Sequence, residues 1–559
     1  MEKLSRKYLF FIMGMLIFVC IGLRLVFIDL PLWYDEAHSV LIAQMGFPFE
    51  INKYLLETDL QHTPFYFYLL HFWIKCFGEN DIVLKILSLI FSVCSIPAIY
   101  TLSKKFVNDK TALIAPLLLV FNTFHVIYST EVRMYSLIMF LSILSVKYMY
   151  EYLENDDTKA LVKLSLVNFL MPYIFTGSFV FIAAQIISVV LIFSKSRNLK
   201  NYLISNLVLF LSLIPYFIII TGYYLKRSEF LLTHVTDFSL ANIFGIFQNF
   251  LAPFCGSIFW ATLNPFYLNF ETLTLVFIPV FLAIYLIYKA VKNSDKNILL
   301  LSLITFITFA IFTLFAANKT IVLAPRYLIF ILPLILILVN FGLAKQKKIF
   351  LIIFLLYYCI TSTYFVYSDT TLKTLKTTSL ISSVNYIKSL NLNRNDVVIM
   401  PFASSVIKHY INYENPPQIP RIEAIQELRI YNNKNFYSDK TIERFKNEQT
   451  NFVFKDLILS KDYISENFHQ YIKRTFVNPA AKGSYILFAV FASDAEALMS
   501  EEELHKIFKN QDSSNSDDLI LHGILAKFFL DIHKIIQEQA VLKNTKIIDN
   551  NVYFLYQKL

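Results

Sequence analysis

The feature that most constrains this chain is a series of long apolar runs separated by short, mostly basic segments. A helix needs about 20 apolar residues to cross the hydrocarbon core of a bilayer. The chain is 56% hydrophobic and only 16% charged, whereas a soluble protein has about 25% charged residues. A polytopic α-helical membrane protein is therefore predicted. The expected spans are 8–30, 82–102, 111–128, 133–153, 161–176, 178–194, 203–225, 270–290, 297–316, 326–344 and 348–367.

The basic residues between these runs predict the orientation of the chain. Lys and Arg collect in cytoplasmic loops, and this rule accounts for the net charge of +9 without a nucleic-acid partner. Residues 154–159 are the one acidic segment on that side. The basic segment 1–7 leads into an apolar run without a cleavage site and reads as an uncleaved anchor. We expect a bacterial inner-membrane protein with a cytoplasmic N-terminus and its C-terminal part in the periplasm.

The apolar run Pro64–Phe77 is assigned to the membrane surface rather than to a span. It is about 14 residues long, which is below spanning length. Counting it as a span would also move all later basic loops to the outside. Aromatic and basic residues such as Trp73 and Lys75 suit a helix that lies in the interface. The expected architecture has about 11 to 13 transmembrane helices with interfacial helices.

The C-terminal third has a different composition, with more charge and shorter apolar runs. We expect residues 1–367 to form the transmembrane domain, with an interfacial loop at 31–81, and 368–559 to form a soluble α/β domain outside the membrane. No nucleotide-binding loop is present. The expected elements are strands at Asp396–Met400 and Ser484–Ala492 and helices at Ile381–Leu390 and Leu519–Leu542.

Two adjacent carboxylates, Asp35 and Glu36, follow the first apolar run. Placing a carboxylate at the membrane interface costs free energy, so such a residue is expected to be solvated or to have a function. Asp35 would also serve as the N-cap of a following amphipathic helix. A divalent metal held by this pair and His38 is a further hypothesis. It is not favoured, because the side chains of consecutive residues point apart. No other cofactor is predicted.

Several charged residues share the expected outer face with this pair. Cations beside carboxylates at headgroup depth suit a lipid phosphate as substrate, because a cation stabilises the phosphate and a carboxylate deprotonates the attacking group. Taken singly, each Arg is also typical of a side chain that extends toward lipid headgroups. A single His is more typical of an interface residue than of a ligand-binding residue. The residues are His62, Glu131, Arg133, Lys319 and Arg326.

The order of these motifs resembles the GT-C glycosyltransferases of the protein O-mannosyltransferase and lipid A aminoarabinose transferase superfamily. The resemblance is strongest over about the first 155 residues and weak in the C-terminal domain. The residues that carry it are Asp35-Glu36-Ala37, His62-Thr63-Pro64-Phe65-Tyr66, Tyr128-Ser129-Thr130-Glu131-Val132-Arg133-Met134-Tyr135-Ser136-Leu137 and Pro325-Arg326-Tyr327.

The resemblance implies a polyprenyl-phosphate-linked sugar as donor and a lipid, glycan or protein as acceptor, with transfer on the outer face. Asp35 would be the catalytic base and Glu36 its support, while Arg133 and Arg326 would bind the donor phosphate. Two positions depart from the family pattern, since His62-Thr63-Pro64 replaces a commoner His-Pro-Pro or Lys-Pro-Pro and Lys85 stands where many relatives have Arg. The other substrate-binding residues implied are His62, Glu131, Tyr135, Lys319 and Tyr327.

Two other functions compete with this reading. A transporter or flippase of a lipid-linked sugar would place charges inside its membrane helices, whereas here Arg24 is the clearest such charge. A polysaccharide polymerase or ligase would use a diphosphate-linked donor. The number of phosphates in the donor separates that enzyme from the one favoured by the motifs.

Overall fold

The computed structural model describes residues 5–58, 62–227, 278–292, 295–317, 325–400, 404–411, 416–419, 470, 473–491, 532–548 and 551–559. The chain divides into two compact units. The helical unit contains Met1–Leu30, Ile42–Gly222 and Thr236–Thr374. The sheet unit contains Pro31–Leu41, Tyr223–Val235 and Leu375–Leu559.

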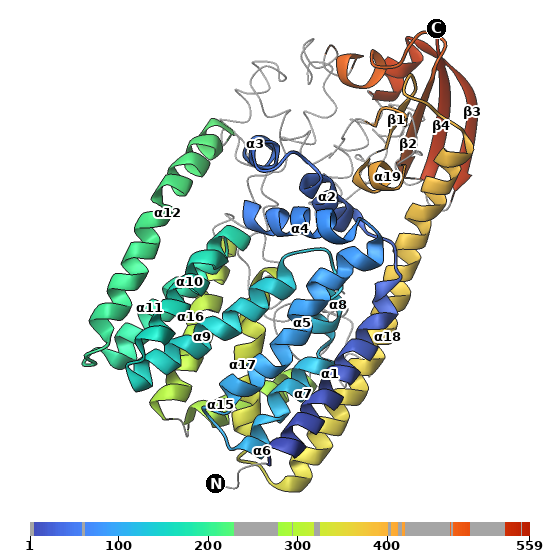
Figure 1. Cartoon of the computed structure of the whole chain (residues 1–559). Coiled ribbons are helices and arrows are strands. Elements are labelled where there is room, and N and C mark those ends of the chain that lie inside the picture. The colour runs from blue at the N-terminus through green and yellow to red at the C-terminus, as the bar shows by residue number, and fades with distance from the viewer. Residues whose placement is uncertain are drawn as a thin grey trace, which may run out of the picture. The chain divides into compact units, whose positions relative to one another are not determined.

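Most helices of the helical unit run side by side, and α4 lies across one end of the bundle (Figure 1). We call this end the α4 end and the opposite end, which carries α6, the α6 end. Helices α12 and α18 begin in this unit and end in the other. The elements are α1 (Arg6–Ile28), α3 (Phe49–Thr58), α4 (Pro64–Phe77), α5 (Asp81–Ser103), α6 (Asp109–Ala112), α7 (Ile114–Phe121), α8 (Thr123–Tyr128), α9 (Tyr135–Asn155), α10 (Thr158–Ile174), α11 (Ser178–Phe193), α12 (Leu199–Arg227), α15 (Ile278–Lys292), α16 (Lys296–Ala317), η4 (Pro325–Ile331), α17 (Leu332–Leu343) and α18 (Lys348–Ser389).

The predicted helical membrane architecture is confirmed. Among the described residues, five helical segments are long and apolar enough to cross a bilayer, and two shorter apolar helices join them. The predicted short helix at Pro64–Phe77 is α4, with the same bounds. The five segments are Arg6–Ile28, Asp81–Ser103, Leu199–Ile219, Lys296–Phe315 and Arg326–Leu343.

The expected single span at 111–128 is wrong, because this stretch is broken into α6, α7 and α8. The break between α7 and α8 lies at Asn122, whose backbone is extended. Its side-chain oxygen accepts a hydrogen bond from the backbone N–H of His125 at 3.0 Å. Asn is a preferred N-cap residue for this reason, so Asn122 starts a new helix inside an otherwise continuous apolar run.

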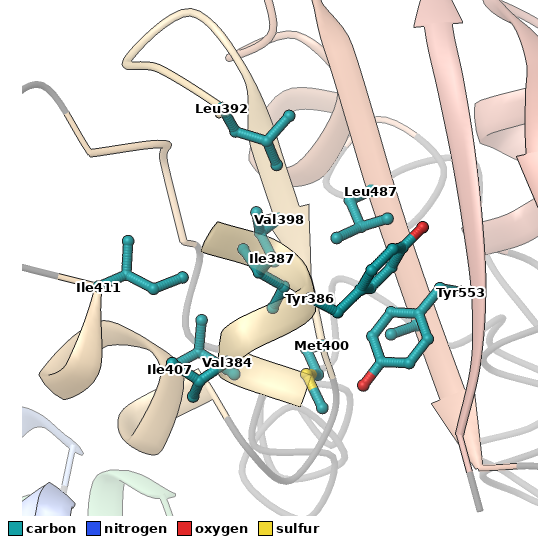
Figure 2. Packing of buried hydrophobic residues seen from close by; sticks show 11 residues of the cluster. Val384, Tyr386, Ile387, Leu392, Val398, Met400, Ile407, Ile411, Leu487 and Tyr553 are labelled. Carbon is teal, nitrogen blue, oxygen red and sulfur yellow. The ribbon is translucent and has the colours of Figure 1, made fainter. Parts of the chain in front are cut away.

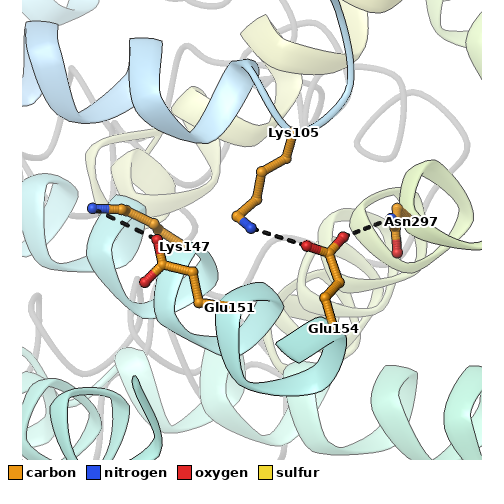
Figure 3. Close-up of polar contacts among 5 residues, drawn as sticks. All are labelled: Lys105, Lys147, Glu151, Glu154 and Asn297. Carbon is orange, nitrogen blue, oxygen red and sulfur yellow. Dashed lines mark hydrogen bonds and ion pairs between the residues drawn. The ribbon is translucent and has the colours of Figure 1, made fainter. Parts of the chain in front are cut away.

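At the α6 end, charged residues form ion pairs that explain the acidic segment 154–159. The Lys105 Nζ atom lies 3.0 Å from one carboxylate oxygen of Glu154, and the Asn297 side-chain amide donates to the other at 2.9 Å (Figure 3). Lys147 and Glu151 form a looser pair at 3.8 Å one turn earlier. Glu154 therefore joins the end of α9 to the residues after α5 and to the start of α16.

The sheet unit contains a four-stranded sheet in the order β1-β2-β4-β3. Strands β1 and β2 are parallel, and the other neighbours are antiparallel. Figure 2 shows one core in which Ile387 of α18, Ile407 of α19, Leu487 of β2 and Tyr553 of β4 pack together. The elements are β1 (Val397–Ile399), α19 (Ser404–Tyr410), β2 (Tyr485–Phe491), β3 (Ala540–Ile548) and β4 (Asn551–Lys558).

Most elements expected for the C-terminal region are confirmed, and one is wrong in part. The strands near 397 and 485 and the helix near 381 are present, the last as the end of α18. The expected helix Leu519–Leu542 instead ends before residue 540, where β3 begins. Residues 532–537 are helical, and residues 519–531 lie outside the described part. Strand β3 forms because its Val, Thr and Ile residues favour the extended backbone and pair with β4.

Candidate functional site

The two acidic residues, Asp35 and Glu36, take different roles at the start of α2 (Tyr34–Ala43). Glu36 is fully buried, and its carboxylate accepts the backbone N–H of Trp33 at 3.1 Å. The backbone N–H of Glu36 in turn donates to the carbonyl of Trp33 at 3.0 Å. The bond to the Glu36 carboxylate is half of a capping box. The helix-capping role expected for Asp35 therefore belongs to Glu36.

Asp35 is partly exposed, in the first turn of α2. A carboxylate there is favoured by the partial positive charge of the helix N-terminus. Its main-chain carbonyl accepts the hydroxyl of Ser39 at 2.9 Å, within the same helix. Asp35 is therefore the carboxylate of the pair that solvent reaches.

The segment that leads into α2 is held by α19 of the same unit. The Tyr410 hydroxyl accepts the backbone N–H of Leu32 at 2.8 Å. Farther along the segment, the rings of Tyr34 and His38 stack with centroids 6.3 Å apart. The acidic segment thus belongs structurally to the sheet unit.

The helical unit holds the other predicted residues around the loop 129–134, between α8 and α9. This loop is buried along its whole length, including Glu131 and Arg133. Buried carbonyls need donors, and the Ser88 hydroxyl of α5 lies 2.5 Å from the carbonyl oxygen of Glu131. The loop is therefore shaped by contacts with a membrane helix.

Arg133 lies against the beginning of α4. Its Nη2 atom is 2.7 Å from Nε2 of His62, and its guanidinium carbon is 6.0 Å from the centre of the Tyr135 ring. A guanidinium only donates hydrogen bonds, so the imidazole accepts at Nε2. Pro64 at the first turn of α4 and the extended Thr63 before it fix where His62 sits.

Arg326 approaches the same loop from η4. It shares a hydrogen bond with the Tyr128 hydroxyl, which also lies within electrostatic range of Glu131. The Arg326 guanidinium is 5.3 Å from the centre of the Tyr327 ring. Since the rings of Tyr128 and Tyr135 are 5.0 Å apart, these contacts connect Arg326 to Arg133.

We call this set the arginine cluster. It brings together six of the residues predicted from the sequence and adds Tyr128, which lies in the quoted motif but is not among the predicted site residues. Asp35 and Glu36 belong to the sheet unit, and Lys319 lies outside the described residues. The members of the cluster are His62, Tyr128, Glu131, Arg133, Tyr135, Arg326 and Tyr327.

The chemistry of the arginine cluster favours an anionic ligand. Two guanidinium groups, an imidazole and three phenol rings lie at one buried loop, against the single carboxylate of Glu131. Arg is the side chain best suited to phosphate because its planar fork donates two parallel hydrogen bonds. Within the described residues, no group of three or more His, Cys, Asp or Glu side chains is arranged to hold a metal.

Comparisons with known proteins agree with this architecture. Residues 61–220 match the family model of dolichyl-phosphate-mannose-protein mannosyltransferases. That range contains His62, Tyr128, Glu131 and Arg133, whereas Asp35 and Arg326 lie outside it. None of the curated proteins compared with the sequence matches it.

The fold is shared with the solved protein ArnT of Cupriavidus metallidurans. Its structure bound to undecaprenyl phosphate matches with a TM-score of 0.54 and 10% identity, covering 99% of this chain and 98% of that one. Its apo structure matches with a TM-score of 0.55 and 8% identity over the same shares. The family match and the shared fold support the resemblance to the GT-C glycosyltransferase superfamily, and the chain is a multi-pass helical membrane protein.

Proposed function

We propose that this protein is a membrane glycosyltransferase that moves a sugar from a polyprenyl-phosphate-linked donor to an acceptor at the outer face of the membrane. The observation that carries the proposal is the arginine cluster, in which Arg326 approaches the buried loop that carries Arg133. The similar fold of ArnT, solved with a bound lipid phosphate, supports the donor class. No cofactor is part of the proposal.

In the proposed reaction, Asp35 accepts the proton of an acceptor hydroxyl. The acceptor oxygen attacks the anomeric carbon of the sugar and forms the new glycosidic bond. The bond between that carbon and the phosphate oxygen breaks, and polyprenyl phosphate leaves with the electron pair. Arg133 and Arg326 stabilise the negative charge that grows on the phosphate, which is the largest electrostatic demand of such a step. His62 supports Arg133 through their hydrogen bond.

The separation of the two carboxylates by their surroundings supports Asp35 as the base. A general base must reach the proton that it accepts, and Asp35 is partly exposed whereas Glu36 is buried and bound to the backbone of Trp33. Glu36 supports the reaction by shaping the start of α2.

The decisive experiment compares cells that produce the intact chain with cells that produce Asp35→Asn. We expect the variant to insert into the membrane normally and to lose transfer by at least about 100-fold, the usual contribution of a general base. Mass spectrometry of surface lipids, glycans and proteins measures the loss and identifies the acceptor. Asp29→Asn is the matched control, since Asp29 is an exposed carboxylate at the end of α1. Unchanged products from Asp35→Asn would refute the assignment.

The same material separates the proposal from its competitors. Purified protein in proteoliposomes with a polyprenyl-phosphate sugar should form a new glycosidic bond and release the lipid monophosphate. A flippase would move the lipid without forming that bond. A polymerase or ligase would require a diphosphate-linked donor and release the lipid diphosphate.

A further inference from the structure

Helix α5 carries four buried polar side chains on one face, Lys85, Ser88, Ser92 and Ser95, and the first three bind other segments. Lys85, Ser88 and Ser92 are spaced by three and four residues, so they lie one above the other along the helix. Their exposed fractions are 0%, 2% and 0%. Polar groups inside a membrane helix are costly unless they are hydrogen-bonded. The partners of this stripe lie on other segments, and those segments lead to the candidate site.

Lys85 binds the end of α1. Its ammonium group lies 3.1 Å from the carbonyl oxygen of Phe27 and 3.3 Å from that of Ile28, and it contacts the carbonyl of Leu30 as well. The last carbonyls of a helix have no partner within the helix, and a cation there also complements the helix dipole. Lys85 therefore fixes the point from which the chain reaches Asp35 within five residues.

Ser88 binds the loop of the arginine cluster. Its hydroxyl lies 2.5 Å from the carbonyl oxygen of Glu131 and 3.4 Å from that of Arg133. A hydroxyl has one proton to donate, so the shorter contact is the main hydrogen bond. This bond holds the loop at the residues whose side chains belong to the cluster.

Ser92 binds the helix that precedes the same loop. Its hydroxyl is 2.9 Å from Nε2 of His125 in α8 and 3.2 Å from Nε of the fully buried Arg24 in α1. The remaining guanidinium nitrogens of Arg24 reach the carbonyls of Cys20 and Val120 and the Nδ1 atom of His125. Three helices thus meet at Ser92.

The donors of Arg24 determine the tautomer of His125. A guanidinium N–H cannot accept, so Nδ1 of His125 accepts from Arg24 at 2.7 Å. The imidazole proton then lies on Nε2 and is donated to Ser92. The carbonyl of Leu119, 2.8 Å from Nδ1, receives no proton in this tautomer.

We propose that the Lys85-Ser88-Ser92 stripe of α5 is a positioning element of the helical unit: Lys85 fixes the end of α1, after which the chain continues to Asp35, and Ser88 and Ser92 fix the loop that carries Glu131 and Arg133. These are positioning residues, since none of them reacts. The proposal rests on the proposed function for its kinetic consequences. Its structural claim is that binding of a lipid phosphate depends on Ser88.

The test compares Ser88→Ala with Ser95→Ala. Ser95 lies on the same helix and is equally buried, but its hydroxyl donates only to the carbonyl of Phe91 in its own helix. We expect Ser88→Ala to weaken binding of undecaprenyl phosphate to the purified protein roughly five- to tenfold, the effect of one lost buried hydrogen bond. Ser95→Ala should change it less than twofold, with a similar midpoint of thermal unfolding. Ser88→Thr, which keeps the hydroxyl, should restore binding.

The outcomes separate this inference from the proposed function. Equal binding by Ser88→Ala and Ser95→Ala would overturn the inference, even if Asp35→Asn abolishes transfer. If the unchanged protein binds the lipid phosphate but transfers no sugar, the proposed function fails and the binding comparison still decides the role of Ser88.

Kinetics of transfer distinguish the role of Lys85 from that of Ser88. Lys85→Gln should lower kcat about tenfold with little change in KM, because Lys85 leads to the base and not to the donor phosphate. Ser88→Ala should raise KM by the factor measured in binding. The same change in kcat and KM for both variants would show a general loss of structure and contradict the separate roles. If Lys85→Gln fails to fold, the comparison of Ser88 with Ser95 remains decisive.

Discussion

The two ends of the helical unit use charged residues in different ways. At the α6 end, Lys105 and Glu154 form an ion pair whose side chains are 17% and 32% exposed (Figure 3). At the α4 end, Arg133 is 5% exposed and lies against an imidazole and a phenol ring. The first arrangement needs no ligand to account for it. The second brings guanidinium groups and phenols together at a buried loop, with Arg133 buried and Arg326 partly exposed.

This difference separates the charge pattern of a membrane protein from a site built for chemistry. Exposed ion pairs contribute little to stability, with a median of about 0 to 1 kcal/mol. A buried guanidinium is costly unless its surroundings hold it in place. The contacts of Arg133 and Arg326 therefore indicate a function that the pairs at the α6 end do not require.

The largest effect is expected from removing a cation of the arginine cluster. Arg133→Gln should reduce transfer by about 100-fold or more, because it removes a donor that stabilises the leaving phosphate. Arg197→Gln, at an exposed position between α11 and α12, is the control and should leave transfer within twofold. Equal losses of transfer in both variants would show that the buried Arg133 matters no more to the reaction than an exposed cation. Initial rates in proteoliposomes provide the measurement.

A smaller effect is expected from substituting Tyr128, the member of the cluster that was not among the predicted site residues. Tyr128→Phe removes the hydrogen bond to Arg326 and keeps the ring packing, so transfer should fall roughly five- to tenfold. Tyr100→Phe is the control on α5, since Tyr100 is a buried tyrosine that lies toward the α6 end. A normal rate for Tyr128→Phe would remove Tyr128 from the cluster.

The smallest effect is expected at the α6 end itself. Glu154→Gln should lower the free energy of unfolding by at most about 1 kcal/mol and leave transfer unchanged, because the pair with Lys105 is partly exposed. Glu151→Gln, whose pair with Lys147 is longer at 3.8 Å, should cost about 0.3 kcal/mol. Thermal unfolding in low and high salt measures both. A loss of transfer in Glu154→Gln with normal stability would show that this end also serves the reaction.

Features set by local sequence were predictable, as α4 illustrates. Its length, its proline at the first turn and the glycine after its last residue fixed the bounds Pro64–Phe77. The break at Asn122 was not predicted, because hydropathy averages over a capping residue inside an apolar run. The end of the expected helix at 519–542 was also missed, because β3 forms through pairing with β4, which no local pattern reports.

The candidate site was predictable as a set of residue types and not as a set of contacts. The motif order selected Arg133 and Arg326, but nothing in the sequence joins Arg326 to Tyr128 across about 200 positions. Because Asp35 and Glu36 are adjacent, the sequence also did not show that the two carboxylates have different surroundings. Only the turn geometry at Trp33 shows that one carboxylate binds the backbone while the other reaches solvent.

The capping role of Glu36 has a consequence for how related sequences should diverge. The backbone N–H of Trp33 needs only an oxygen acceptor at the right reach, and an amide oxygen on a side chain of the same length meets that need. Gln should therefore replace Glu at position 36 in active relatives, whereas Asp, one methylene shorter, should be rare there. At position 35 a side chain without a titratable oxygen should mark a lineage that has lost the reaction. The two adjacent positions would then vary under different constraints, hydrogen bonding to the backbone at position 36 and proton transfer at position 35.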